Sequence, residues 1–110
     1  MLRCPTTNAG SGLPAVKPVG GGIDGAPLSV TDVAVVSTNA IGADGFYIYS
    51  TTPLHLRLST AGTPATTNDA PIPAGIPLVF YSEFDDKISL IKMSGAADGT
   101  CWVHACATFD

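Results

Sequence analysis

The stretch GFYIYSTTPLHLRL, residues 45–58, decides the fold class of this chain. In residues 54–58, three leucines alternate with His55 and Arg57. This alternation is the pattern of a strand with one buried face and one solvated face. Residues 45–50 alternate in the same way, with tyrosines opposite Phe and Ile, and a Thr-Thr-Pro sequence ends that segment. The stretch therefore predicts two consecutive β-strands.

Outward from this stretch, further segments are rich in β-branched and aromatic residues. They cover residues 28–36, 76–82, 87–93 and 100–107. Turn-forming sequences separate them, including two Asp-Gly dipeptides of the kind found in hairpins. Helix formers are scarce, because the chain has one glutamate and no glutamine. Six short strands of this spacing predict an all-β fold, a small sandwich or barrel of about six to eight strands.

The first part of the chain has a different composition. Residues 1–27 contain four prolines and six glycines and show no apolar period. Proline removes backbone donors and glycine raises the entropy cost of ordering, so this segment is expected to be an extended arm. A β-sandwich domain is expected over residues 28–110. Two interpretations of the arm stay open, a segment that orders against a neighbouring subunit and a disordered tail.

Residues 59–75 form a second segment rich in proline, between two predicted strands. Proline favours extended conformations in the residues that precede it. A loop of this length is unusual in a small domain and is often functional.

The composition favours assembly over several other functions. Apolar residues make up 45% of the chain and charged residues 13%, against about 25% charged in typical domains. So little charge argues against disorder and favours association with copies of itself or with a larger surface. Five scattered Lys and Arg residues do not form a nucleic-acid groove. No stretch has the length of a membrane helix, and residues 1–5 lack the apolar start of a signal peptide.

The sequence offers no catalytic or metal-binding pattern. Cys4, Cys101 and Cys106 do not have the spacing of a zinc site, and we expect them to be reduced apolar side chains. His55 and His104 are expected on the solvated faces of different strands. The acidic turn after residue 82 lacks the EF-hand pattern, and no nucleophile elbow or P-loop is present. These observations predict a protein that is not an enzyme and holds no cofactor and no metal.

Aromatic side chains on the outward faces of the strands are candidates for an interface, because Tyr and Trp are favoured in protein contacts. A second sheet that covers them is the alternative. The candidates, with prolines of the two extended segments, are Tyr47, Tyr49, Tyr81, Trp102, Pro14, Pro18, Pro64 and Pro71.

The order of these elements resembles that of small β-rich virion proteins of tailed bacteriophages, especially the head-decoration or cement proteins. The resemblance covers residues 45–107. It consists of the strand GFYIYS, the loop GTPATTNDA, the turn and strand PIPAGIPLVFY, and the closing segment DKISLIKMSGAADGTCWV.

The resemblance implies a structural protein that stabilises a bacteriophage capsid, with residues 1–27 and the loop 59–75 as its contact segments. Its partner would be the major capsid protein, with neither nucleic acid nor membrane bound, and it would act as a homo-oligomer, with a trimer plausible at a capsid three-fold position. It would be made in the host cytoplasm and lie on the outer surface of the virion. A tail, fibre or head–tail adaptor module and a carbohydrate-binding β-sandwich are the alternatives, the latter because sugars stack on exposed aromatic rings.

Overall fold

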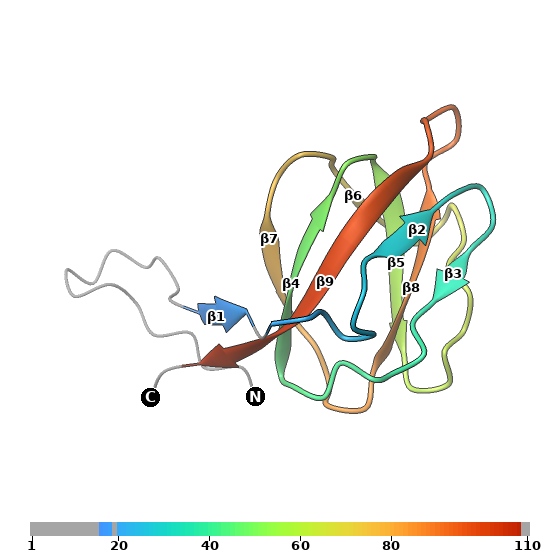
Figure 1. Cartoon of the computed structure of the whole chain (residues 1–110). Helices are drawn as coiled ribbons and strands as arrows, with labels where there is room; N and C mark the ends of the chain where they lie inside the picture. The colour runs from blue at the N-terminus through green and yellow to red at the C-terminus, as the bar shows by residue number, and fades with distance from the viewer. Residues whose placement is uncertain (1–15, 19, 109–110) are drawn as a thin grey trace.

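The structure is a computed structural model that describes residues 16–18 and 20–108. These residues form nine strands and no helix, and the strands make two antiparallel sheets packed face to face (Figure 1). The predicted all-β fold is confirmed. Of the two predicted alternatives, a sandwich and a barrel, the structure is a sandwich. Since the described residues contain no helix, none of them builds a helical membrane span.

The front sheet in Figure 1 has five strands in the order β1-β9-β4-β7, and β2 also pairs with β9. Its strands are β1 (Val16–Pro18), β2 (Leu28–Val30), β4 (Gly45–Ser50), β7 (Leu78–Tyr81) and β9 (Gly99–Thr108). The second sheet has the order β3-β8-β5-β6. Its strands are β3 (Val35–Val36), β5 (Leu54–Ser59), β6 (Ala70–Ile72) and β8 (Lys87–Lys92).

The core between the sheets consists of the inward-facing residues of each strand. In β5, Leu54 and Leu56 are buried, whereas His55 and Arg57 are only half-buried, as the alternation predicts. The side chains that are fully enclosed include Val30, Phe46, Ile48, Leu54, Ile88, Leu90 and Cys101. Strands from both ends of the sequence thus contribute to one apolar layer.

The segment 28–36 forms two strands rather than the single strand that its composition favours. The Thr31 hydroxyl donates to the carbonyl oxygen of Val33 (3.2 Å) and accepts from the amide of the same residue (3.1 Å). Such a local side-chain contact stabilises a turn. The chain therefore bends after β2, which pairs with β9, and β3 continues in the other sheet against β8.

The loop predicted over residues 59–75 crosses the outer face of the four-stranded sheet and includes β6. Ala65 is buried, and its amide donates to the Ser89 hydroxyl on β8 (2.8 Å). The Nδ1 atom of His55 on β5 lies 2.9 Å from the carbonyl oxygen of Asp69 and donates to it. The loop thus covers the part of this outer face around Ser89 and His55.

Part of the predicted arm contacts the sandwich. β1 pairs with the end of β9, from Val16 opposite Thr108 to Pro18 opposite Cys106. In the segment after it, the amide of Ile23 donates to the carbonyl oxygen of Val103 on β9 (3.0 Å), and the Ile23 side chain packs against the core. Residues 1–15 lie outside the described residues.

Asp24 ties this segment to the rest of the sandwich. Its carboxylate oxygens accept from the backbone amides of Thr38 (2.8 Å) and Asn39 (2.9 Å), in the loop after β3. The Asn39 side-chain amide returns a bond to the carbonyl oxygen of Ile23 (3.2 Å). Residues 20–27 are therefore anchored to both sheets.

Candidate binding site

The outer face of the five-stranded sheet carries a group of aromatic rings. Tyr47 and Tyr49 on β4 point outward because their neighbours Phe46 and Ile48 are buried in the core. On β9, Trp102 lies directly opposite Tyr49. Antiparallel pairing therefore brings together side chains that are more than fifty positions apart in the sequence.

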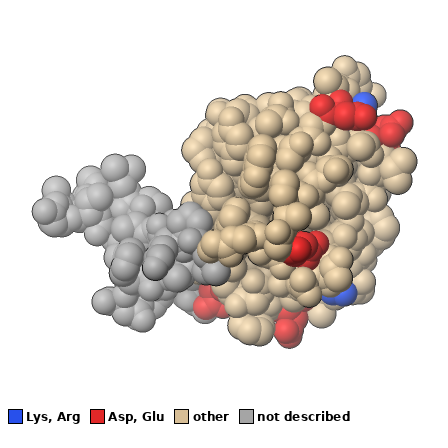
Figure 2. Space-filling model, in the orientation of Figure 1, with Lys and Arg blue, Asp and Glu red and all other residues tan. Residues whose placement is uncertain are grey.

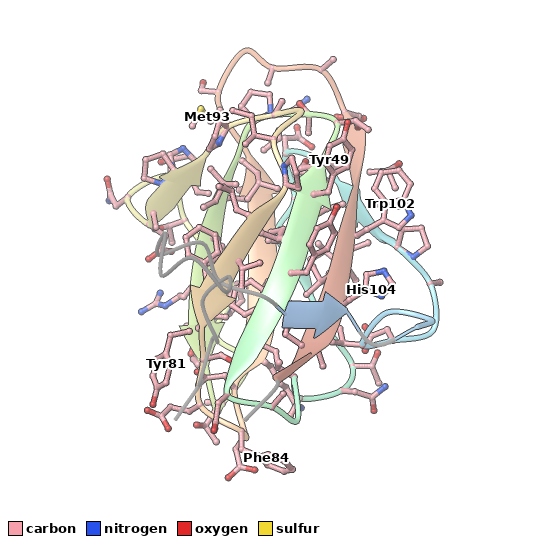
Figure 3. The ribbon with its side chains drawn as sticks, turned by 90° about the vertical axis from the view of Figure 1, so that its left-hand side faces the viewer. Tyr49, Tyr81, Phe84, Met93, Trp102 and His104 are labelled. Carbon is pink, nitrogen blue, oxygen red and sulfur yellow. The ribbon has the colours of Figure 1, made fainter. Side chains whose placement is uncertain are left out.

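These rings line a shallow hollow together with His104, which lies opposite Tyr47. The centroids of the Tyr47 and His104 rings are 6.2 Å apart with their planes at 70°, and those of Tyr49 and Trp102 are 5.9 Å apart at 45°. The hollow has a volume of about 370 Å³. Figure 3 shows Tyr49, Trp102 and His104 along the same side of the molecule.

The orientation of His104 is set by the segment before β2. The backbone amide of Gly22 donates to Nδ1 of His104 (3.2 Å), so Nδ1 is the acceptor and the neutral ring carries its hydrogen on Nε2. Gly22 has a φ of +73°, and a Cβ there would lie 3.3 Å from the carbonyl oxygen of Val103. A glycine at this position therefore allows the segment to approach β9 closely.

A second, smaller hollow adjoins the first. It has a volume of about 180 Å³ and lies between the segment 21–27 and the side chains of Trp102 and His104. Trp102 and His104 line both hollows. These two side chains thus form a ridge with an aromatic hollow on one side and a hollow of small residues on the other.

This face of the molecule has little charge. None of the residues that line the two hollows is charged. Figure 2 shows the same face as a mostly uncharged surface, with charged atoms at its upper right and along its lower edge and one acidic group right of its centre. The residue Trp102 is 37% exposed, so the ridge is in contact with solvent.

The other predicted interface residues lie elsewhere. Tyr81 is 51% exposed at the end of β7, far from the hollow in Figure 3, and its hydroxyl donates to the Glu83 carboxylate (3.5 Å). That carboxylate, with a smaller effect of burial and of Asp44, raises the pKa of Tyr81. Pro64 and Pro71 are exposed on the loop and on β6. Pro18 lies in β1, and Pro14 is outside the described residues.

Sequence reasoning missed two parts of this site. The first is His104, which lies two residues after Trp102. Alternation along a strand puts the two side chains on one face, so this spacing could have identified His104 as part of the site. The packing of Gly22 against His104 has no such signal, because it depends on a contact over 82 positions. No three His, Cys, Asp or Glu side chains converge as metal ligands within residues 16–18 and 20–108.

One buried group gives the protein a specific pH dependence. Burial raises the pKa of the Cys101 thiol to about 12, against about 8.5 in an unfolded chain. The unfolded state therefore loses this proton first as the pH rises above about 8.5, and the folded state becomes less stable by up to about 1.4 kcal/mol per pH unit. The contribution is fully present below that range and is lost toward pH 12.

Urea unfolding at pH 8, 9 and 10 measures this effect. We expect the free energy of unfolding to fall less steeply with pH in Cys101→Ala than in the wild type. The comparison is made between slopes, because the cavity left by the substitution lowers stability at every pH. Equal slopes would show that the Cys101 thiol does not control this decline.

Comparison of the chain with protein-family models, with curated proteins and with solved structures found no match. The arrangement itself is suited to binding, because aromatic rings on a rigid sheet provide contact area at little cost in side-chain entropy. Function is therefore inferred from the fold and from two surfaces that the described residues do not cover, the aromatic face and the sheet edge at β1.

Proposed function

We propose that this chain is a structural protein that attaches to a larger protein shell, and specifically a decoration protein on the outer surface of a bacteriophage capsid. Its partner would be the major capsid protein. The proposal combines the resemblance of residues 45–107 to such proteins with the architecture of the sandwich.

The observation that carries the proposal is the ribbon formed by β1 and the end of β9. Pairing of β9 with β4 ends at Ala105 opposite Phe46, whereas β9 itself continues to Thr108 and pairs there with β1. Figure 1 shows this ribbon projecting beyond the body of the sandwich. Among the residues that the structure describes, β1 is the last strand in its sheet, and an edge strand can pair with an extended segment of another chain.

The body of the molecule suits a role in reinforcement. Its two sheets enclose a continuous apolar core, and no buried side-chain N or O atom of the described residues lacks a hydrogen-bond partner. A sandwich of this kind transmits load without internal rearrangement, because protein cores are densely packed. Attachment through a projecting ribbon would leave this body intact while the edge joins a neighbour.

The number of copies on a particle distinguishes decoration from the adaptor alternative. We expect the purified protein to sediment with capsids in hundreds of copies per particle, since decoration repeats over the whole shell. About a dozen copies or fewer would favour a tail, fibre or head–tail position. The absence of binding to capsids would contradict the virion assignment.

A further inference from the structure

We propose that the hollow lined by Tyr47, Tyr49, Trp102 and His104 binds a neutral oligosaccharide. This inference does not depend on the virion assignment, because it stands on the aromatic face, whereas the attachment stands on the edge of β1. The hollow's volume of about 370 Å³ falls in the range of small-molecule sites, about 300–1,000 Å³.

The rings provide the apolar part of saccharide recognition. One face of a pyranose ring presents C–H groups, and these pack against the electron-rich face of an aromatic ring. Trp102 and Tyr49 are tilted at 45° to each other across β9 and β4, with neither ring covered by the other in a parallel stack. A sugar ring placed over the indole would therefore also touch the phenol.

The polar groups of the same side chains suit sugar hydroxyls. Each tyrosine hydroxyl both donates and accepts hydrogen bonds. The hydrogen bond from the Gly22 amide to Nδ1 fixes the His104 ring beside these hydroxyls before any ligand binds. A preorganised wall of this kind reduces the entropy cost of binding.

The absence of charge in the lining defines the class of saccharide. An acidic sugar needs a cation for its carboxylate or phosphate, and neither hollow is lined by Lys or Arg. A neutral sugar loses no ionic hydration on entering. The smaller hollow across the Trp102 ridge gives a second sugar unit a place to lie, so an oligosaccharide should bind more tightly than its monosaccharide.

Trp102 is the only tryptophan in the chain, so its fluorescence reports directly on the hollow. The full chain is titrated with maltohexaose, cellohexaose, mannohexaose and chitohexaose, with a decaproline peptide as a competing class of ligand. We expect the tryptophan fluorescence to change saturably with at least one of the four oligosaccharides. The corresponding monosaccharide should give a weaker fluorescence change at the same concentration. Saturation-transfer NMR on the same mixtures detects the bound sugar independently.

Variants of two tyrosines on the same sheet test where the ligand binds. Tyr49→Ala should weaken binding about tenfold or more, and Tyr49→Phe should retain most of it because the ring remains. Tyr81→Ala is the matched control, since Tyr81 is exposed on the same sheet outside the hollow, and it should bind like the wild type.

Three results would overturn the saccharide assignment. They are the absence of a saturable response to all four oligosaccharides, unchanged affinity in folded Tyr49→Ala, and saturable binding of decaproline alone. None of them bears on the number of copies that sediment with capsids.

Discussion

Phe46→Ala is expected to lower the free energy of unfolding by about 3–5 kcal/mol, because the phenyl ring is fully enclosed between the two sheets. Its ring centroid lies 5.8 Å from that of Phe80 on the neighbouring strand β7, so the substitution leaves a cavity that Phe80 only partly fills. For a domain of this size, the melting temperature should fall by about 15 °C. Thermal unfolding followed by circular dichroism measures it.

Phe84→Ala is the matched control for this substitution. It removes the same side chain from the turn between β7 and β8, where Phe84 is 63% exposed. We expect a change within about 0.5 kcal/mol, as for most surface substitutions. Similar losses in the two variants would contradict the position of the core described above.

Two truncations are expected to differ strongly in stability. Deleting residues 1–18 removes β1 and everything before it but leaves the bond between Ile23 and Val103 in place. Deleting residues 1–27 also removes the Ile23 side chain from the edge of the core and the Asp24 carboxylate from two backbone amides. The longer deletion should cost about 3 kcal/mol more, since it loses apolar burial and several hydrogen bonds.

Urea unfolding of the two truncated proteins compares their stabilities directly, and sedimentation with capsids compares their attachment. We expect both to lose attachment, because β1 is absent from each, and only the longer deletion to lose much stability. Equal stability of the two proteins would place the boundary of the folded unit at residue 28, as the composition alone suggests. Retained attachment of either truncation would contradict the role proposed for the β1 edge.

Alternation of apolar and polar residues was sufficient to predict the fold class and most strands. In β4 and β5 successive side chains point to opposite faces of the sheet. Once the buried face is known, the direction of every side chain in the strand is therefore known too. The division of residues 28–36 between two sheets could not be predicted in this way, because it depends on a turn made by the Thr31 side chain. β6 was hidden in a loop whose proline content argued against a strand.

The candidate site was predictable only in part. Outward-facing Tyr47, Tyr49 and Trp102 were expected from alternation, and the structure places them in one hollow. Tyr81 satisfied the same rule but lies at the far end of its strand, because the register of β7 pairs it with Gly45 rather than with Tyr47 or Tyr49. Registers between strands distant in sequence depend on the whole core, so the grouping of these rings needed the structure.

The ribbon of β1 and β9 also has a mechanical consequence. Val16 and Thr108 form its last described pair, so a force that pulls these two residues apart loads the described backbone hydrogen bonds one pair at a time, and this part of the ribbon unzips under a small load. A force along β9 that pulls it past β4 loads their five paired positions together, in shear. On a shell that is strained, this protein would therefore resist the strain well along β9 and poorly across the last described pair of the ribbon.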